Sequence, residues 1–322
     1  MPTTADHRYS LHRADWERDQ AALRAVRLSV FVREQQVPEA LEWDGRDGSA
    51  VHLIAESEDG AAIGTARLLP SGQIGRMAVV PDWRKRGVGT HLLAELQRIA
   101  GDEAFPTPFL NAQTKVTRFY AALGFESVGD GFEEAGIPHQ RMERKHGQLP
   151  LALDVETRLL GQTNGLLRID QPSMLQLAVS AMATQASREL RVLTPDLEPV
   201  LYDQAPFLDN VTRLAIDRRG RLPVRILLID AEPALHRGHR LIELSRKLSS
   251  AVQIQAVPAE LAEQCDHYLL ADDSGYCLRR SAAPNAALVD FNATAHVRRM
   301  QRGFEQLWAQ AEVHTGLRRL HL

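Results

Sequence analysis

The sequence predicts a two-domain protein of the α/β class, with strands and helices mixed in both halves. Its 322 residues exceed one ordinary domain, and its 44% hydrophobic content is enough for packed cores. The segment from Gly75 to Gly101 joins a strand-length apolar run, a glycine loop and a helical pattern. In residues 151–322, strand-like and helix-like segments alternate, which is typical of an α/β layer.

The glycine loop, Arg84 to Gly89, follows an apolar strand that ends at Pro81 and Asp82. The helix after it carries an apolar stripe made of Leu92, Leu93, Leu96 and Ile99. Because glycine has no side chain, backbone N–H groups can converge there on an anion at the positive end of the helix. The loop therefore predicts a pyrophosphate site. It has neither the Gly-Lys-Ser/Thr end of a nucleotide-triphosphate loop nor the G-x-G-x-x-G of a dinucleotide fold.

The spacing Arg84-x-x-Gly87-x-Gly89 resembles the loop with which GNAT acetyltransferases grip the pyrophosphate of coenzyme A. The resemblance implies that acetyl-CoA lies in a V-shaped gap between two strands of a mixed central sheet. It assigns acetyl-CoA binding to Met77, Ala78, Val79, Arg84, Lys85, Arg86, Gly87, Val88, Gly89 and Thr90.

A second motif is the Tyr-x-x-x-Gly-Phe at Tyr120 and Gly124-Phe125, behind a short strand and a helix. It is similar to the end of the fourth helix of GNAT proteins, where the tyrosine hydroxyl protonates the leaving thiolate. That resemblance implies that Tyr120 is the general acid. The alternative is a core aromatic residue with its hydroxyl at the rim.

The flanking segments are similar to the ElaA/YjcF-type branch of the same family. Two motifs lie upstream of the glycine loop: Val-Phe-Val-x-Glu-Gln, which ends at Gln35, and Asp-x-x-Asp-x-x-x-x-His, which runs from Asp44 to His52. Two lie downstream: Ala-Gln, which ends at Gln113, and Gly-Ile-Pro-His, which ends at His139. Together with the loop and Tyr120, the resemblance covers roughly residues 8 to 146.

The family reaction is the direct attack of an amine on the thioester, which needs a neutral amine, an oxyanion stabiliser and an acid for the sulfur. The backbone N–H of Val79 is the expected oxyanion donor. Glu34 and His139 are candidates for the base, and a water relay without a dedicated base is equally open. Asp44 and Asp47 are expected to attract a cationic amine, although each of these four side chains could also cap a turn or form a surface pair. The acceptor could be a small amine, an antibiotic, or a lysine of a protein or peptide.

Composition argues against other classes of protein. The net charge is −3, with 18 Lys and Arg against 21 Asp and Glu in residues 1–150 and 20 against 20 afterwards, so a general nucleic-acid binder is not expected. No apolar run has the length of a membrane span, and the polar N-terminus is unlike a signal peptide. Two cysteines suggest a reducing cytoplasm, and no metal is expected. The excess of arginine over lysine is consistent with a GC-rich bacterial source.

The expected domains are residues 1–146, a linker and lead-in at 147–169, and a second domain at 170–322. The linker contains both Gly147 and Pro150. In the second domain, strands are expected at residues 190–194, 223–229, 251–257, 267–271, 276–280 and 286–291, and helices at 235–249 and 292–313.

This order resembles one half of a phospholipase D-like domain, whose signature is His-x-Lys-x-x-x-x-Asp. The matching strand begins at His267 but has Leu269 in place of the lysine and Ser274 in place of the aspartate. The sequence thus predicts a catalytically inactive relative. Since such enzymes need two halves, a homodimer through this domain is expected.

One further cluster in this domain could bind an anion. His236, Arg237, His239 and Arg240 follow the strand at 223–229, where α/β sheets collect ligands. The alternative is a solvated helix face with His239 packed inward. At the level of the whole chain, the alternative to an acetyltransferase is an acetyl-CoA-binding sensor whose second domain recognises a partner.

Overall fold

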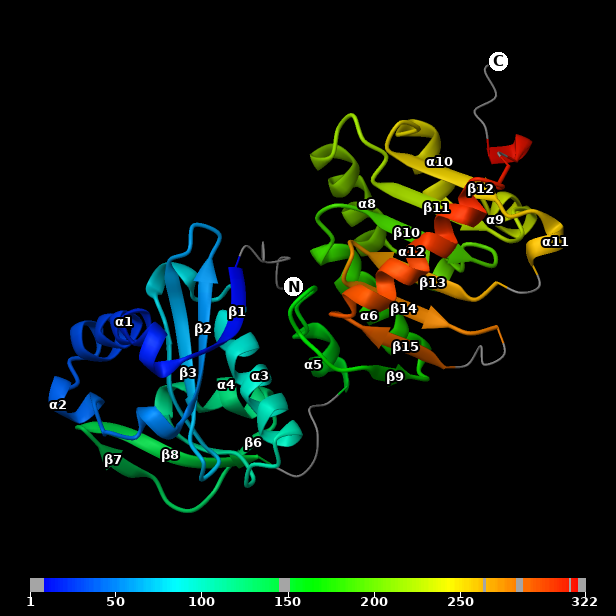
Figure 1. The fold of residues 1–322 in the computed structure, drawn as a ribbon. Helices are drawn as coiled ribbons and strands as arrows, with labels where there is room; N and C mark the ends of the chain where they lie inside the picture. The colour runs from blue at the N-terminus through cyan, green and yellow to red at the C-terminus, as the bar shows by residue number, and fades with distance from the viewer. Residues whose placement is uncertain (1–8, 145–150, 263–264, 282–285, 313, 318–322) are drawn as a thin grey trace. The chain divides into compact units, whose positions relative to one another are not determined.

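The computed structural model describes residues 9–144, 151–262, 265–281, 286–312 and 314–317. The chain divides into two compact units, Met1–Thr157 and Arg158–Leu322, each with its own mixed sheet (Figure 1). The division falls inside the segment 147–169 that the sequence predicts as a linker. The α/β fold class is confirmed. No helix in the described ranges is long and apolar enough to cross a membrane.

The described residues of the first domain form a sheet of eight strands in the order β1-β2-β3-β4-β5-β8-β6, with β7 paired to β8. All neighbours are antiparallel except β4 and β5, which are parallel. The strands are β1 (Tyr9–Ala14), β2 (Val51–Ser57), β3 (Ala62–Leu68), β4 (Gln73–Val79), β5 (Phe109–Gln113), β6 (Phe125–Ser127), β7 (Phe132–Glu134) and β8 (Ile137–Arg144). The helices are α1 (Trp16–Arg27), which continues as a π-helical segment (Leu28–Glu34), α2 (Glu39–Glu42), α3 (Val88–Asp102), α4 (Thr117–Ala122) and α5 (Leu151–Glu156).

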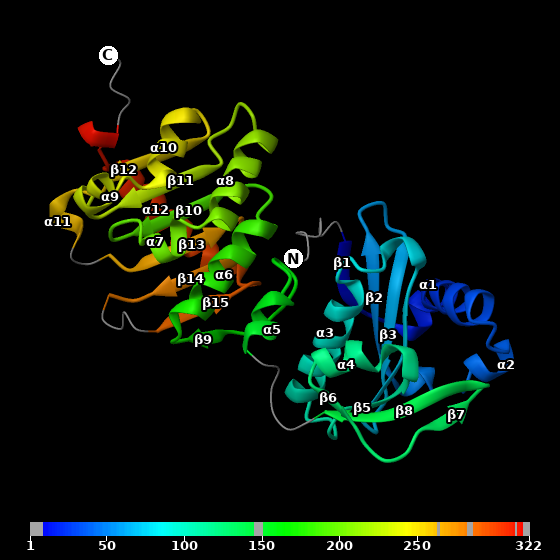
Figure 2. The ribbon, with the colours of Figure 1, turned by 180° about the vertical axis from the view of Figure 1, so that it is seen from behind.

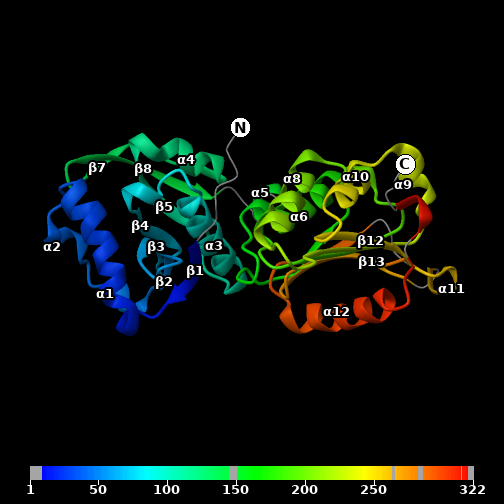
Figure 3. The same ribbon diagram turned by 90° about the horizontal axis from the view of Figure 1, so that it is seen from above.

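Helices cover both faces of this sheet, as Figure 3 shows for α1 and α3. Successive residues of β2 point to opposite faces. Leu53 packs in the core that includes Leu92 and Leu96 of α3, whereas Ile54 packs against Leu23 of α1. Because both faces are buried, β2 and β3 are apolar along most of their length rather than strictly alternating.

Local sequence explains where α1 begins. The Asp15 carboxylate caps it by accepting a hydrogen bond from the N–H of Arg18. Acidic residues in its first turn and basic residues in its last turn match the helix dipole.

The described residues of the second domain form a seven-stranded sheet in the order β12-β11-β10-β13-β14-β15-β9. β10, β11 and β12 are parallel, and the other neighbours are antiparallel. The strands are β9 (Leu167–Ile169), β10 (Leu190–Thr194), β11 (Val224–Leu228), β12 (Val252–Ala256), β13 (His267–Ala271), β14 (Gly275–Arg279) and β15 (Ala287–Asp290). The helices are α6 (Pro172–Gln185), α7 (Pro199–Tyr202), α8 (Ala205–Asp217), α9 (Glu232–Arg237), α10 (Arg240–Lys247), α11 (Ala259–Ala262) and α12 (Thr294–Trp308).

In this domain α6, α7 and α8 cover one face of the sheet (Figure 2), and α12 lies on the opposite face (Figure 3). The expected strands are all present. The single helix expected at 235–249 is wrong, because Gly238 adopts φ +68° and separates α9 from α10. The helix expected at 292–313 is shorter in the described residues, since α12 ends at Trp308.

Candidate active site

The central feature of the first domain is the separation of β4 from β5. The two parallel strands pair only at Gln73 with Phe109 and at Ile74 with Leu110. β4 continues to Val79, and β5 to Gln113, without further pairing between them. The edge of β4 from Met77 to Val79 is therefore open on the side of β5, and extended chains bind to such edges by main-chain hydrogen bonds.

A β-bulge in β4 accompanies this separation. Thr65 of β3 pairs with Ala78, but Arg67 pairs with Gly75, so β4 has one extra residue. Arg76 lies in the bulge with φ +51°, which is rare for a residue other than glycine. Bulges bend a strand and increase its twist, which carries the end of β4 away from β5.

The side chain of Arg76 fixes the bulge to α2. Its Nη2 donates to the carbonyl oxygens of Leu41 and Glu42 at 3.3 and 3.0 Å, and its Nε lies 3.2 Å from the Glu42 carboxylate. These contacts supply the positive-φ backbone with tertiary support. The sequence analysis did not identify Arg76.

The backbone of Val79 points toward the open side of β4. The N–H of the next residue, Val80, donates to the carbonyl of Ile63 in β3, at 3.0 Å. Since successive backbone groups of a strand alternate in direction, the N–H and C=O of Val79 point away from β3. The Arg84 Nε donates to that carbonyl at 2.9 Å. The Val79 N–H is thus directed to where an oxyanion donor is expected.

The predicted pyrophosphate loop joins β4 to α3. Gly87, with φ +87°, is the residue before α3, so glycine is needed there for conformational reasons. The first N–H groups of α3, at Val88, Gly89 and Thr90, have no partner within the helix. A Cβ atom added to Gly89 would lie 3.6 Å from the Phe119 ring, so the loop is close to α4. Val88 itself is buried, and its side chain anchors the helix to the core.

The three cationic residues of this loop, Arg84, Lys85 and Arg86, differ in their contacts and backbone conformation. The Arg86 guanidinium lies 5.0 Å from the centre of the Trp83 ring. Lys85 has φ +59°. Arg84 turns back toward the sheet, as its bond to Val79 shows.

Tyr120 extends from α4 to β4, with its hydroxyl 3.9 Å from the Met77 sulfur. Its ring makes edge contacts with Phe119 and Phe125. Burial raises the pKa of Tyr120 to about 12, so the phenol keeps its proton at neutral pH. The structure thus brings together the sequence-predicted acid and the open edge of β4.

Glu34, at the end of the π-helical segment, is bound to the loop. Its carboxylate accepts two hydrogen bonds from Arg84, at 2.7 and 2.5 Å. These hydrogen bonds lower the pKa of Glu34. A carboxylate with a lowered pKa is a weak proton acceptor.

His139 lies on β8, opposite Gln113 of β5. Its Nδ1 lies 2.8 Å from the Ile137 carbonyl oxygen, which can only accept, so Nδ1 is the donor and Nε2 of the neutral ring is an acceptor. The ring stacks on Phe132, with centroids 5.9 Å apart. The Gln113 side chain donates to the Gln35 side chain at 2.8 Å, which joins β5 to the residue after Glu34. Gln35 and Gln113 occur in the family motifs, but the sequence analysis gave them no role.

Comparison with known proteins identifies this domain. Residues 15–146 match the family model of the acetyltransferase (GNAT) domain. The uncharacterized N-acetyltransferase YjcF of Bacillus subtilis is 33% identical over 120 residues, which are 36% of this chain and 86% of YjcF. The chain belongs to the GNAT acetyltransferase family. Its enzyme class, N-acetyltransferase, is thereby confirmed.

Further proteins are similar to parts of this chain. A UPF0039 protein of Schizosaccharomyces pombe is 35% identical over 125 residues, which are 36% of this chain and 81% of that protein. The crystal structure of Escherichia coli ElaA is 29% identical, with a TM-score of 0.39, and the match covers 42% of this chain and 99% of ElaA. Residues 171–320 match the family model of a domain of unknown function, DUF7931. That match names no activity, so the likeness to phospholipase D stays a prediction.

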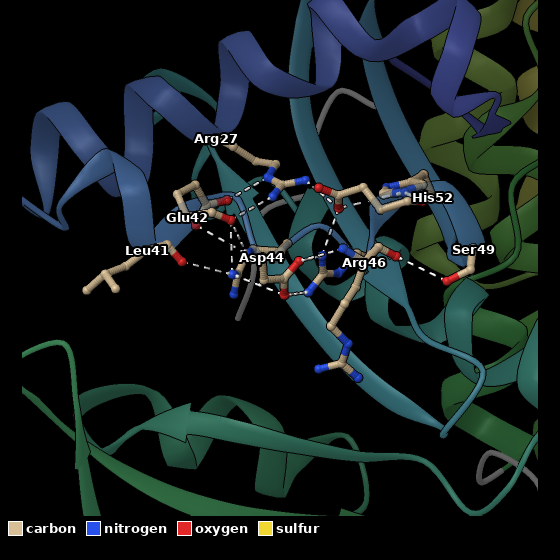
Figure 4. Close-up of polar contacts among 10 residues, drawn as sticks. Arg27, Leu41, Glu42, Asp44, Arg46, Ser49 and His52 are labelled. Carbon is tan, nitrogen blue, oxygen red and sulfur yellow. Dashed lines mark hydrogen bonds and ion pairs between the residues drawn. The ribbon is translucent and has the colours of Figure 1, made fainter.

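In this GNAT domain, the carboxylates of Asp44 and Asp47 are already paired with arginines. Figure 4 shows Asp44 in a network of polar contacts with Arg27, Glu42 and His52 close by. Asp44 binds Arg67 through both carboxylate oxygens, at 2.8 and 2.7 Å. One oxygen of Asp47 accepts from Arg27 and from Arg67, each at 2.8 Å. Their role in attracting the substrate amine stays a prediction, and an amine would have to compete with these arginines for the carboxylates.

The charges of this network balance. The guanidinium groups of Arg27, Arg67 and Arg76 face the carboxylates of Glu42, Asp44 and Asp47. Hydrogen bonds from Arg67 lower the pKa of Asp44, whereas burial outweighs nearby cations and raises the pKa of Glu42. Burial also lowers the pKa of His52, which favours its neutral form. The network joins α2 to the β4 bulge through the contacts of Arg76.

The cationic cluster of the second domain is also dispersed. The break at Gly238 puts His236 and Arg237 on α9, His239 at the N-cap of α10 and Arg240 at the first position of α10. Arg237 pairs with Asp196 at 2.8 Å, Arg240 pairs with Asp203 at 2.6 Å, and the exposed His236 lies 3.3 Å from Glu232. His239 is buried, accepts from the Leu241 N–H and bonds the Leu197 carbonyl. Each of the four side chains thus already has a partner, and the anion site stays a prediction.

Among the described residues, no group of three or more His, Cys, Asp or Glu side chains could hold a metal ion.

Proposed function

We propose that the first domain transfers an acetyl group from acetyl-CoA to a primary amine by direct attack of the amine on the thioester. One observation carries this proposal. β4 separates from β5 after Ile74, and the Tyr120 hydroxyl lies beside Met77 on the edge that becomes open. The strand edge that could bind an extended substrate is thus adjacent to the protonated phenol of Tyr120.

Several features fit acetyl-CoA. The open edge at Met77 and Val79 suits the amide groups of pantetheine, while Ala78 contributes through its pairing with Thr65 of β3. The pyrophosphate fits the N-terminus of α3, where the N–H groups from Val88 to Thr90 point outward and Lys85 and Arg86 add positive charge. Gly87 and Gly89 keep side chains out of this approach.

Two groups serve the acyl transfer itself. The N–H of Val79, directed to the open side, would stabilise the oxyanion that forms when the amine attacks the carbonyl. Tyr120 would give its proton to the departing sulfur, because burial keeps the phenol protonated.

For the proton of the amine, His139 is a better candidate than Glu34. The Nδ1 contact to Ile137 leaves Nε2 as an acceptor. Glu34 is engaged by Arg84 and its pKa is lowered. We assign Glu34 and Arg84 instead to a brace between the acceptor side and the acetyl-CoA loop.

The direct test is thiol release from acetyl-CoA over a panel of small amines, aminoglycosides and lysine peptides, with the acetylated product confirmed by mass spectrometry. We expect acetyl-CoA-dependent acetylation of at least one primary amine. Binding of acetyl-CoA without transfer to any member of the panel would favour a sensor.

The second domain is proposed to be a phospholipase D-like half without catalysis. Leu269, where the lysine is expected, is 1% exposed and packs in the core, so no cation occupies that position. His267 is only partly buried, and burial lowers its pKa. We expect no hydrolysis of bis(p-nitrophenyl) phosphate. Hydrolysis that is lost in His267→Ala would refute this.

Two further expectations concern the whole protein. We propose self-association through the second domain, which light scattering at micromolar concentration tests directly. A monomer mass would remove this expectation. We also propose a reducing cytoplasm as the location, because both cysteines, Cys265 and Cys277, are free thiols.

A further inference from the structure

The second domain contains a pocket between α12 and its sheet. Its volume is about 500 Å³, within the range of sites for small ligands. The sheet contributes Leu193, Tyr268 and Leu278, and α12 contributes Met300, Gly303 and Leu307. We propose that this pocket binds an aliphatic carboxylate, with its chain between α12 and the sheet and its head group at Arg280.

The shape of the pocket depends on Gly303. Met300, Gly303 and Leu307 are spaced so that they lie on one face of α12. A glycine in the middle of a helix weakens it and often marks close packing. Here the space is open instead, because a Cβ atom added to Gly303 would meet no atom within 4 Å. The missing side chain therefore enlarges the pocket rather than admitting a neighbour.

The wall of the pocket favours an apolar chain. Besides the leucines and Met300, it includes Leu261 and the thiol of Cys265. That thiol donates to the Leu261 carbonyl at 3.1 Å, so its polar group is already engaged. Apolar surface of this kind gains free energy when a hydrocarbon chain displaces water from it.

The charged groups at the pocket favour an anionic head group. Arg280 lines it and is exposed, and no carboxylate among the described residues lies within ion-pair distance of its guanidinium. Asp266 also lines it, but one of its oxygens accepts from the Ser281 N–H at 2.9 Å. A carboxylate placed at Arg280 would form a charge-assisted hydrogen bond with its guanidinium.

Cys265 provides a direct readout of occupancy. Burial raises the pKa of both thiols, to about 12 for Cys277, so Cys277 reacts more slowly. Labelling with N-ethylmaleimide, followed by peptide mass spectrometry, reports each cysteine separately. Decanoate at about ten times its dissociation constant should slow labelling of Cys265 about tenfold. Decanol should protect less, and decylamine least.

Two variants test the geometry. Gly303→Leu fills the pocket and should abolish protection while raising the melting temperature, which excludes unfolding as the cause. Arg302→Leu, one residue away on an exposed position of α12, is the matched control and should keep protection. Arg280→Gln should reduce the protection of Cys265 by decanoate to the protection given by decanol. Equal protection by all three compounds, or protection that persists in Gly303→Leu, would overturn the proposal.

Discussion

The carboxylate of Glu34 accepts two hydrogen bonds from the guanidinium of Arg84, and the same guanidinium donates to the carbonyl of Val79. One arginine therefore joins the π-helical segment, the end of β4 and the acetyl-CoA loop. The family resemblance made Glu34 one of two candidates for the base and assigned Arg84 to acetyl-CoA binding. Their pairing favours a positioning role for both.

Glu34→Gln tests this role. Both side chains are about 40% exposed, so the loss of the ion pair should lower the free energy of unfolding by less than about 1 kcal/mol. We expect a raised KM for acetyl-CoA and a nearly unchanged kcat, with a further rise in KM when Arg84→Gln is added, because that change also removes the hydrogen bond to the Val79 carbonyl. A kcat lowered about 100-fold would instead indicate a general base.

The pH dependence of this pair has a definite sign. Hydrogen bonds from Arg84 lower the pKa of Glu34 in the folded protein. The contribution of the pair is therefore complete above the ordinary carboxyl pKa and is lost as pH falls through the lowered value. The KM for acetyl-CoA should stay constant on acidification until below the usual carboxyl range. A rise in KM that begins near neutral pH would contradict this.

The acetyl-CoA loop is tested by Gly87→Leu combined with Gly89→Leu. The first change strains a positive-φ position, and the second puts a side chain against Phe119. Calorimetry should show a large loss of acetyl-CoA affinity. Gly101→Leu, near the other end of α3 and in open space, is the control and should bind normally. Unchanged affinity in the double variant would remove the loop from the binding site.

The buried network predicts a loss of stability rather than of substrate affinity. Arg27→Met leaves the carboxylates of Glu42 and Asp47 with fewer partners inside the domain. Removing one partner of a buried ion pair costs about 3–5 kcal/mol, which urea unfolding can measure. Arg24→Met, which loses mainly a contact with the Trp43 ring, should cost about 1 kcal/mol or less. If Arg27→Met and Arg24→Met lowered the free energy of unfolding equally, the ion pairs of Arg27 would contribute little to stability.

Asp44→Asn separates the two explanations of that aspartate. If Asp44 supports Arg67, the variant should lose stability with an unchanged KM for the amine. A raised KM for amines at full stability would restore its predicted role in attracting substrate.

Elements with strong local signals could be predicted from sequence. The apolar run, the glycine loop and the leucine stripe of α3 lie within one segment, and each has a local physical cause. The role of Tyr120 as the acid came from the family resemblance, whereas its position next to Met77 came from the structure. Gly238 itself is a local signal for the break between α9 and α10. The helical pattern of the residues around it nevertheless predicted one continuous helix.

What sequence analysis missed depends on contacts distant along the chain. Asp47 meets Arg27 and Arg67, each 20 residues away, and nothing local marks these partners. Arg76 adopts positive φ although it is not glycine, because α2 supplies acceptors for its side chain. Charged residues near a predicted site are thus ambiguous until their partners are known.

The central claim is that the Tyr120 phenol is the acid of acetyl transfer. The decisive measurement is the single-turnover rate of Tyr120→Phe at saturating acetyl-CoA, with Tyr202→Phe, another buried hydroxyl, as the control. We predict a rate lowered about 100-fold or more, with acetyl-CoA affinity and melting temperature nearly unchanged. Because burial raises the pKa of Tyr120 to about 12, the wild-type rate should not fall through loss of this proton below about pH 10. A wild-type rate in Tyr120→Phe, with chemistry limiting, would contradict the account and leave Tyr120 as a core aromatic.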